Sequence, residues 1–571
     1  MKRIKAIDYL KTIAIIGVLL FHVGAIQNGY LGVEVFFVCA GFLMIKGINN
    51  DEFKPIQYII KRIAAFWPLV AIVGVISIGI GYFTMLPDDY ENLAESVIAS
   101  NVFCNNILLA ITTKDYWNIS NVYKPLMHMW YIGVLIQSIV FLSIFLWIAS
   151  KISKKKGIKY SLILISVFSF VVWCMPCFST EAKFFYFPFR LFEITIGCLI
   201  SYLPDIKINT KVVKLFGDIG IGLLFFILFS GWNISNNAGI IIVVFLTAIT
   251  IWSRSNVEED IIDEKIYKLI TVPGRYSYDV YVWHQAIIAF LYYSVFQSFN
   301  SMLVCLTIVL TIVLSAVSVI LRKEIKFMNS IWKRIIFAIV FVTIGFSLSG
   351  YIYIHAGVTR NVPELGIDQK DIHRNMHSEY VDRPYFWDKD FNDDAKIHVL
   401  VLGDSYGRDF ANILKESKYS NDLEISYIYG SDFSQATDRI SQADFVFYGA
   451  YGWKTIPEGL KNIPKEKLYV IGNKSFGNSN GIIYANRTKD NYFEQRVELP
   501  NDMILNNNAF KGIYGDNYID MITPLIDENN KIRIFTDDNY YISQDCKHLT
   551  KQGAQYYSRI LNLSFLTAGD R

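Results

Sequence analysis

The fold of this chain is decided by an apolar stretch at residues 7–26, with the sequence IDYLKTIAIIGVLLFHVGAI. About 20 predominantly apolar residues in a helix span the hydrocarbon core of a bilayer, so the stretch predicts a transmembrane helix. The basic segment MKRIK precedes it, as in a secretory signal, but no clear small-x-small cleavage site follows. We therefore expect this helix to be retained as the first of a series.

Comparable stretches recur as far as about residue 355. Hydrophobic residues make up 53% of the 571 residues and charged residues 18%, whereas about a quarter of a soluble protein is charged. Residues 1–355 are therefore expected to form a polytopic α-helical membrane domain. The sequence predicts about eleven transmembrane helices, at 7–26, 29–47, 63–85, 129–149, 160–178, 186–203, 214–232, 237–253, 275–297, 302–321 and 334–355.

The Lys and Arg residues between these stretches predict the orientation of the domain. With a cytoplasmic N-terminus, the outside loops before the last span contain only Lys114, Lys124 and Lys183, and the large majority of basic loop residues are inside. Cytoplasmic loops of membrane proteins carry the excess of basic residues. We expect a protein of the bacterial inner (plasma) membrane, and an odd number of spans then places the C-terminal part outside the cytoplasm.

The composition indicates neither a nucleic-acid partner nor a metal site. The net charge is +3, and no basic patch is interleaved with stacking aromatic residues. The seven cysteines are scattered, and only Cys174 and Cys177 form a CxxC pair. Because no second pair completes a metal site, we expect no metal, and a redox or disulfide role for the CxxC pair stays open.

After the last span the sequence becomes that of a soluble protein. Residues 356–395 are polar and charged, and we expect a linker or an extension packed on the next domain. From Lys396 the pattern is α/β, because the apolar run Ile397–Leu402 is of strand type and a helix-like stretch, Arg408–Leu414, follows it. About 175 residues suit one three-layer α/β domain, which we place at residues 396–571.

Two short motifs at opposite ends of this domain predict nucleophilic catalysis. Ser405 ends the tripeptide Gly403-Asp404-Ser405 at a strand-to-helix turn, where its hydroxyl is exposed and the helix N-terminus favours a developing negative charge. Near the C-terminus, Asp545 precedes His548 by three residues, a spacing that lets the carboxylate orient the imidazole. His548 would then accept the Ser405 proton as general base.

This arrangement resembles the SGNH hydrolase family over roughly Lys396 to Leu563. The chain departs from the family at Tyr406, where a His usually follows the serine, and it lacks a clean Gly-x-Asn-Asp motif. A binding domain with a degenerate triad remains an alternative. The resemblance implies Ser405 as nucleophile, His548 as base, Asp545 as its orienting residue, and an oxyanion hole made by the Ser405 N–H with a later loop, for which Gly449 and Asn473 are the candidates.

The first predicted span also contains ionisable residues, which cost roughly 2.5–3.5 kcal/mol each inside a bilayer on insertion scales. Lys11 and His22 are eleven residues apart, close to three helical turns, so they share one face about 16 Å apart along the axis. One could hold an anionic donor while the other performs acid–base chemistry. Spacing alone equally allows Lys11 to snorkel to the headgroups and His22 to bond a neighbouring helix.

Six motifs follow one another over about residues 5–325. They are Ile7–His22, Gly32–Phe42, Lys61–Pro68, His128–Ile132, Phe189–Glu193 with Gly197, and Gly274–His284. This ordered set resembles the membrane acyltransferase-3 family. The resemblance implies a transferase that takes an acyl group from cytoplasmic acyl-CoA, here acetyl-CoA as donor substrate, and delivers it to an extracytoplasmic glycan. A sub-group with a fused SGNH domain acts on O-antigen, peptidoglycan or another surface polysaccharide.

The same resemblance assigns roles within the membrane domain. The family's Arg before the catalytic His is Lys11 here, which lacks the planar bidentate fork of Arg. Ala65 stands for a second family Arg, Leu135 for a Glu and Ala40 for a Ser. The donor site is therefore expected to be rebuilt, or its chemistry altered or lost. The implied residues are His22 as catalytic residue and Lys11, Arg62, Arg190, Glu193 and His284 as donor-binding residues.

Three functions remain open from the sequence. The first is an O-acetyltransferase of a surface polysaccharide, in which the membrane domain brings the acetyl group across and the Ser405 domain completes the transfer. The second is an extracytoplasmic esterase with a membrane anchor, and the third is a transporter or flippase with a glycan-sensing domain. The ordered motifs favour the first. Its expected partners are membrane lipid and a polysaccharide acceptor, without nucleic acid.

Overall fold

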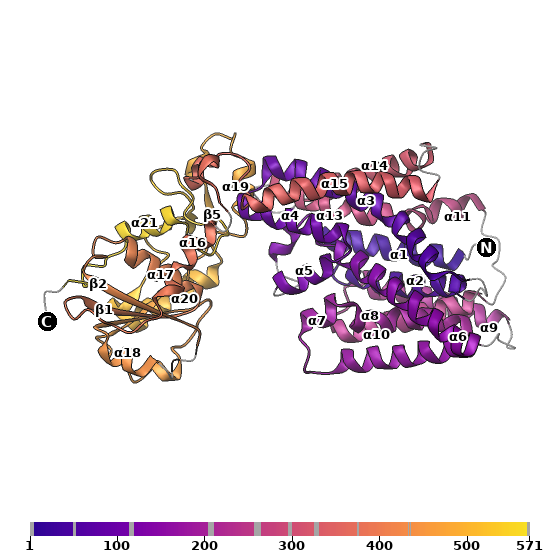
Figure 1. Ribbon diagram of the computed structural model, residues 1–571, viewed down its shortest axis with the longest axis horizontal. Helices are drawn as coiled ribbons and strands as arrows, with labels where there is room; N and C mark the ends of the chain where they lie inside the picture. Colours follow the sequence, from indigo (N-terminus) through magenta and orange to yellow (C-terminus); the bar gives the residue numbers. More distant parts are fainter. Residues whose placement is uncertain are drawn as a thin grey trace. The chain divides into compact units, whose positions relative to one another are not determined.

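The computed structural model divides the chain into two compact units. One comprises Met1–Gly81 with Asn92–Gly350, and the other Tyr82–Glu91 with Tyr351–Arg571 (Figure 1). Lys114, one of the basic residues used to predict the orientation, does not belong to the described part of the chain. The residues that the structure describes are 5–48, 53–113, 119–203, 210–255, 264–294, 300–324, 330–373, 376–431, 433 and 436–567.

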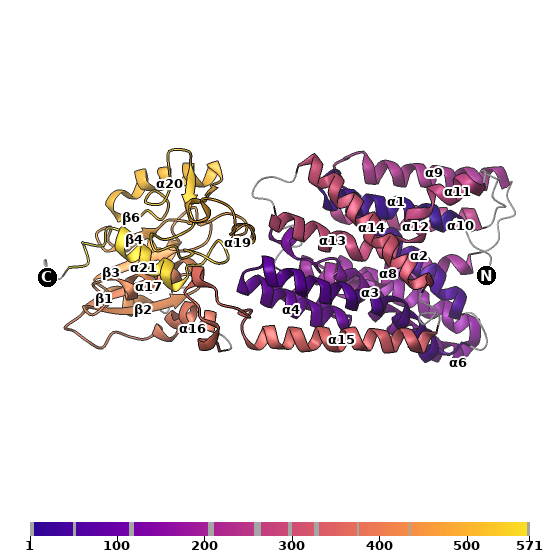
Figure 2. The same cartoon turned by 90° about the horizontal axis from the view of Figure 1, so that it is seen from above.

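The regular structure described in the first unit is helical. Its long helices appear as a bundle in Figures 1 and 2. The helices of this part of the chain are α1 (Lys5–His22), α2 (Gly32–Ile48), α3 (Pro55–Thr84), α4 (Pro87–Asn101), α5 (Asn105–Thr112), α6 (Met129–Cys174), α7 (Thr180–Phe185), α8 (Phe187–Leu199), α9 (Thr210–Phe229), α10 (Asn236–Ser255), α11 (Glu264–Ile270), α12 (Val272–Arg275), α13 (Ser277–Ser294), α14 (Ser301–Glu324) and α15 (Ile331–Ile354).

Each expected membrane span coincides with one of these helices. Within the described residues, eight helices are long and apolar enough to cross a membrane. One of them, α6, has 46 residues and leaves helical geometry at Ser153 and Lys154, so it covers both spans expected between 129 and 178. Helices α1 and α13 coincide with two further expected spans but carry polar groups such as Lys11 and His284. The prediction of a polytopic helical domain is confirmed.

Helices α2 and α8 approach each other closely at two glycines. A Cβ atom at Gly41 would lie 1.9 Å from the carbonyl oxygen of Ile194, and one at Gly197 would lie 2.1 Å from that of Val38. Only glycine permits such contacts, and membrane helices use small residues in this way to bring their backbones together. The close packing holds α2 against α8, and Glu34 of α2 forms an ion pair with Arg190 of α8.

The second unit is an α/β domain around a five-stranded parallel sheet. Its strand order is β2-β1-β3-β4-β6, and β5 and β7 form a separate antiparallel pair. The strands are β1 (Ile397–Gly403), β2 (Leu423–Tyr429), β3 (Phe445–Gly449), β4 (Leu468–Ile471), β5 (Arg496–Glu498), β6 (Tyr518–Ile519) and β7 (Lys531–Arg533). The helices are α16 (Met376–Asp382), α17 (Ser405–Glu416), α18 (Thr437–Gln442), α19 (Gly481–Ala485), α20 (Asn501–Tyr514) and α21 (Lys551–Ile560).

Both faces of the parallel sheet are covered, because alternate residues of β1 enter different cores. Val399 shares a core with Phe410 of α17 and Tyr557 of α21, whereas Leu400 lies in a second core against which Phe510 of α20 packs. Figure 1 shows α17 and α21 on one side of the sheet and α18 on the other. The predicted three-layer α/β architecture is confirmed.

Residues before β1 pack on the helix that begins at Ser405. Arg408 of α17 forms an ion pair with Asp382 at 2.7 Å. Asn412 of the same helix donates to the Val381 carbonyl at 3.1 Å and accepts from Arg383 Nε at 2.7 Å. This part of the polar segment is therefore bonded to the α/β domain along α17.

Candidate functional site

Ser405 is placed by a tight turn between β1 and α17. β1 ends at Gly403, where φ is +128° and a Cβ atom would lie 1.9 Å from the last carbonyl oxygen of β3, so glycine is required. Asp404 caps α17, because its Oδ1 accepts the Tyr406 N–H at 2.9 Å and its Oδ2 accepts the Tyr451 N–H at 2.7 Å. Ser405 thus begins the helix at the carboxyl edge of the sheet, where α/β folds bind their ligands.

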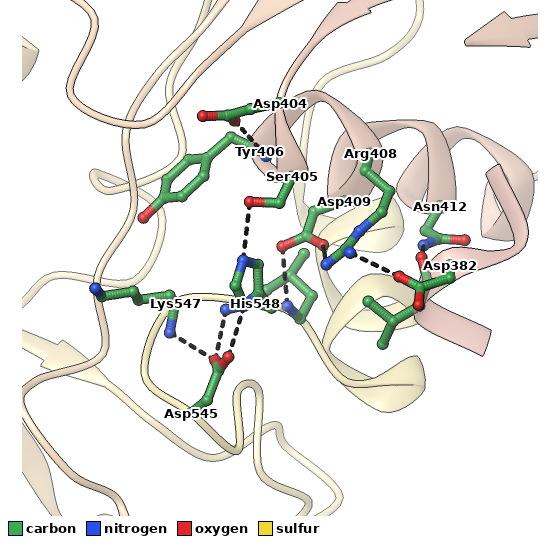
Figure 3. A network of polar contacts seen from close by, with 12 residues as sticks. Asp382, Asp404, Ser405, Tyr406, Arg408, Asp409, Asn412, Asp545, Lys547 and His548 are labelled. Atoms are coloured by element: carbon green, nitrogen blue, oxygen red, sulfur yellow. Dashed lines mark hydrogen bonds and ion pairs between the residues drawn. The ribbon is translucent and has the colours of Figure 1, made fainter. Parts of the chain in front are cut away.

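The side chains of Ser405, His548 and Asp545 form one hydrogen-bonded chain (Figure 3). His548 Nε2 lies 2.9 Å from Ser405 Oγ, and His548 Nδ1 lies 2.6 Å from Asp545 Oδ2. The other carboxylate oxygen of Asp545 accepts the backbone N–H groups of Lys547 at 2.9 Å and of His548 at 2.7 Å. The distance from Ser405 to His548 suits proton transfer, and that from His548 to Asp545 is a short, charge-assisted hydrogen bond. The structure therefore brings together the three residues that the sequence predicts as a triad.

The charge on Asp545 is stabilised next to the imidazole. Partial desolvation by the surrounding chain opposes ionisation, but the hydrogen bond and charge of His548, together with the backbone N–H groups, outweigh it and lower the pKa of Asp545 from 3.8 to about 2. The carboxylate is therefore ionised at neutral pH. It favours the tautomer with a proton on Nδ1, which leaves Nε2 of His548 to accept a proton from Ser405.

The two other oxyanion candidates lie at the same edge of the sheet. Gly449 ends β3 opposite Gly403, and its carbonyl oxygen accepts the Asp404 N–H at 3.2 Å. Asn473 follows β4, and its Oδ1 accepts the Gly452 N–H at 2.9 Å. The structure thus places Gly449 beside the Ser405 turn and bonds Asn473 to the loop after β3. That they stabilise an oxyanion stays a prediction.

A cavity of about 420 Å³ adjoins the His548 end of the triad. One part of its lining comes from residues before β1, including Tyr380 and Asp382, and another from the segment Gln544–Gln552. The volume is within the roughly 300–1,000 Å³ of small-molecule sites. A hydroxyl compound bound in this cavity would meet the imidazole of His548 and the Asp545 carboxylate, which both line it.

In the first unit, Lys11 of α1 and Arg62 of α3 line one small cavity of about 140 Å³. Leu135 and Ala40, two positions at which the chain departs from the acyltransferase-3 pattern, line the same cavity. The Tyr58 hydroxyl accepts a hydrogen bond from Arg62 at 2.8 Å. No sequence pattern indicates the tyrosines of this lining, because they lie on three different helices. They are Tyr58, Tyr131, Tyr278 and Tyr281.

His22 belongs to a different group of side chains, three histidines from α1, α13 and the residue before α6. Its ring centroid lies 4.9 Å from that of His284, which lies 5.2 Å from that of His128. One nitrogen of each ring bonds a backbone carbonyl at 2.6–3.0 Å. The remaining nitrogens of His128 and His284 are buried without a hydrogen-bond partner in the described part of the chain. His128 stands in one of the acyltransferase-3 motifs, but the sequence alone indicates no role for it.

Arg190 and Glu193 form a buried ion cluster with Glu34. Arg190 Nη2 donates to both Glu34 oxygens at 2.7 and 2.9 Å, and its Nε lies 3.1 Å from Glu193 Oε1. The exposed fraction of the side chain is 1% for Arg190, 0% for Glu193 and 3% for Glu34. Arg190 and Glu193 do not line the cavity of Lys11. The predicted donor-binding residues therefore fall into three groups, with Lys11 and Arg62 in the cavity, His284 beside His22, and Arg190 with Glu193.

The cysteines and acidic residues form neither a metal centre nor a disulfide within the described residues. No group of three or more His, Cys, Asp or Glu side chains there could hold a metal ion. All seven cysteines are free thiols, and Cys174 and Cys177 of the CxxC pair are exposed. Cys546 lies beside Asp545, but burial raises the pKa of its thiol, so it is protonated and unreactive at neutral pH.

Comparison with known proteins assigns the membrane unit to a family. The family model of the acyltransferase domain (acyltransferase-3) matches residues 4–323, more than half of the chain. The chain belongs to the acyltransferase-3 family. A protein of Staphylococcus aureus strain COL named "Putative O-acetyltransferase" is 25% identical over 325 residues, 51% of this chain and 52% of that protein. The O-acetyltransferase OatA of S. aureus strain NCTC 8325 is 24% identical over 307 residues, 50% of each chain.

The chain thus spans about half the length of the curated relatives that it matches. The family match covers the motifs from Ile7 to His284, so the resemblance inferred from their order is confirmed. In the second unit, the parallel five-stranded sheet agrees with the fold that the SGNH resemblance implies.

Proposed function

We propose that this acyltransferase-3 protein is an O-acyltransferase that transfers an acetyl group from cytoplasmic acetyl-CoA to hydroxyl groups of a surface polysaccharide, such as O-antigen or peptidoglycan. The observation that carries the proposal is the Ser405–His548–Asp545 geometry in a chain whose other unit belongs to an acyltransferase family. The O-acetyltransferase names of the S. aureus relatives support acetyl as the acyl group and a hydroxyl as the acceptor.

The proposed reaction at Ser405 has two half-reactions. First, His548 Nε2 removes the Ser405 Oγ proton while Oγ attacks the carbonyl carbon of the delivered acetyl group. The bond from that carbon to the donor then breaks, and the donor leaves with the proton from His548. Then His548 removes a proton from a glycan hydroxyl, whose oxygen attacks the acetyl-serine. The Ser405 oxygen leaves and takes that proton back. Asp545 stays ionised and stabilises the imidazolium in both half-reactions.

In the membrane unit, the proposed donor site is the cavity of Lys11 and Arg62. Its volume of about 140 Å³ suits the acyl-thioester end of the donor rather than a whole coenzyme, since drug-sized ligands occupy roughly 300–1,000 Å³. The two cations would attract donor phosphates, and Tyr58 orients Arg62. His22 is the proposed acid–base residue, with His284 beside it. Arg190 and its carboxylates are proposed to support the fold instead, because Arg190 already binds both Glu34 and Glu193 and none of the three lines this cavity.

The proposed topology places the N-terminus in the cytoplasm and the α/β unit outside it, in the bacterial inner membrane. The distribution of loop Lys and Arg residues supports this orientation. It also fits the chemistry, because acetyl-CoA is cytoplasmic and a surface polysaccharide is not. Membrane lipid and the polysaccharide are the proposed partners, and the proposed chemistry uses neither metal nor nucleic acid.

The same triad would serve an extracytoplasmic polysaccharide esterase, because water can replace the glycan hydroxyl in the second half-reaction. The two functions differ in their dependence on acyl-CoA. Membranes containing the protein are therefore given acetyl-CoA labelled in its acetyl group, together with de-O-acetylated polysaccharide. A transferase labels the polysaccharide, and Ser405→Ala abolishes the labelling. An esterase leaves the polysaccharide unlabelled but releases acetate from acetylated polysaccharide, and that result would overturn the proposal.

A further inference from the structure

A buried ion pair lies beside the triad without belonging to it. Lys474, which follows β4, has its Nζ 2.9 Å from Oδ2 of Asp409 on α17, and each side chain is only 1% exposed. Lysine and aspartate are almost never fully buried unless paired, because desolvation strongly disfavours an isolated charge. The other contacts of the two side chains therefore indicate what the pair does.

Asp409 connects the pair to the loop that carries the proposed base. Its Oδ2 accepts the backbone N–H of Leu549, the residue after His548, at 3.0 Å. Asp409 lies four residues after Ser405 on α17, so the two side chains share one face of the helix. Figure 3 shows both reaching toward the segment with His548. One helix therefore contacts this segment twice, at the imidazole through Ser405 and at the backbone through Asp409.

Lys474 is in turn held by Tyr406, the residue after the proposed nucleophile. Lys474 Nζ lies 3.7 Å from the centre of the Tyr406 ring, and the Tyr406 hydroxyl donates to the Lys474 carbonyl at 3.0 Å. Burial, followed by the neighbouring Tyr451 and carboxylates, raises the pKa of Tyr406, so the hydroxyl remains a donor at neutral pH. These contacts give a physical reason for a tyrosine where the SGNH resemblance implies a histidine.

We propose that the Asp409–Lys474 pair is a positioning device for His548. Lys474 compensates the buried carboxylate, and the carboxylate makes a charge-assisted hydrogen bond to the Leu549 N–H. That bond fixes the loop so that His548 Nε2 stays within reach of Ser405 Oγ. Asp409 and Lys474 are positioning residues, since they act through the loop and not on the reacting atoms. The inference rests on the proposed function, because it takes Ser405 as nucleophile and His548 as base.

Two double variants of the full-length protein test this role. One combines Asp409→Asn with Lys474→Met, and the other combines Asp409→Leu with Lys474→Met. Both remove both charges of the pair. Arg408, whose Nη2 lies 3.7 Å from Asp409 Oδ1, keeps its ion pair with Asp382, so neither variant leaves an uncompensated buried ion. They differ in whether residue 409 can accept the Leu549 N–H. The readout is the rate constant with which a fluorophosphonate, which reacts with an activated serine, labels Ser405 in detergent-purified protein. Thermal unfolding reports whether each variant is folded.

We expect the Asp409→Asn double variant to be labelled within about threefold of wild type. The Asp409→Leu double variant should be slower by about 10- to 100-fold, because a misplacement of about 1 Å can reduce a rate by 10². In a His548→Ala background the two double variants should be labelled equally, since the pair acts through His548. Equal labelling rates of the two double variants in the presence of His548 would overturn the proposal. The same rate difference between them in the His548→Ala background would also overturn it. A pair that only stabilises the fold predicts one of these two results.

Two further variants keep the test decisive. Tyr406→Phe retains the ring over Lys474 but removes the hydroxyl that donates to the Lys474 carbonyl. Labelling of Ser405 should therefore slow severalfold, and only when His548 is present. An unchanged labelling rate contradicts the proposal even if the Asp409→Leu double variant fails to fold. As a matched control, the corresponding changes at the exposed Glu458–Lys461 pair should leave labelling unchanged. Failure of the proposed function itself is recognised separately, because wild type and Ser405→Ala would then be labelled alike.

Discussion

Replacing Asp545 by Asn separates the charge of this side chain from its shape. In the structure its Oδ2 lies 2.6 Å from His548 Nδ1, and its Oδ1 accepts two backbone N–H groups of the same turn. Asn has nearly the same shape, so the turn can keep its backbone hydrogen bonds. It lacks the charge that stabilises the imidazolium, and its amide N–H can face Nδ1, which favours the wrong tautomer of His548.

We expect Asp545→Asn to lower Ser405 reactivity by about 10⁴ while the protein stays folded. The fall of the Asp545 pKa from 3.8 to about 2 corresponds to about 2.4 kcal/mol of native-state stabilisation at 1.36 kcal/mol per pKa unit. Because the side chain is 43% exposed, solvent screening reduces this to about 1 kcal/mol. A pKa that is depressed in the folded state adds stability above about pH 4, and the contribution is lost as the pH falls toward 2.

The assay combines fluorophosphonate labelling at pH 7 with thermal unfolding of the detergent-purified protein at pH 7 and pH 3. The unfolding temperatures of wild type and Asp545→Asn should differ slightly at pH 7 and differ less at pH 3, while labelling at pH 7 differs by orders of magnitude. Labelling of the folded variant within tenfold of wild type would show that His548 acts without its carboxylate and would contradict the proposed role of Asp545.

His22→Ala should reduce glycan acetylation by about 10²–10⁴ at normal protein levels, whereas Lys11→Arg should retain acetylation. Unchanged acetylation in His22→Ala would indicate that His22 has only a structural role. Arg190→Met should destabilise the membrane unit by about 3–5 kcal/mol, because Glu34 and Glu193 lose their shared cationic partner. An unfolding temperature equal to that of wild type would show that the cluster does not stabilise the fold. A reporter that works only outside the cytoplasm should be active when fused to the C-terminal end, and activity of a cytoplasm-only reporter there would reverse the topology.

The parts of the site that could be predicted from the sequence depend on short spacings. Asp545 and His548 lie in one turn, and the Gly403–Ser405 motif marks a strand-to-helix junction, so local geometry sufficed to identify both halves of the triad. The membrane helices followed from hydropathy. Helices α4 and α5 have no expected span, because α4 carries acidic residues in its first turn and α5 has only eight residues.

The remaining contacts depend on the tertiary fold, which spacing does not reveal. Arg190 meets Glu34 across 156 residues of sequence, and nothing near Lys474 indicates that Asp409 would neutralise it. Lys11 and His22 do lie on one helix, as expected. They are separated by about three helical turns, and neighbouring helices contribute different side chains at the two levels along α1. Lys11 therefore lies in the cavity with Arg62, whereas His22 lies beside His284.

In the proposed mechanism, Ser405 carries the acetyl group to the acceptor. The most direct test of this role is acetyl transfer from labelled acetyl-CoA to polysaccharide in membranes that contain equal amounts of wild type, Ser405→Ala, His548→Ala and the double variant. Residues of one triad act as a unit. We therefore expect the acetyl-transfer rates of all three variants to fall by about the same factor, to several orders of magnitude below that of wild type. Normal transfer by Ser405→Ala would contradict this mechanism and would show that the membrane unit acetylates the glycan directly.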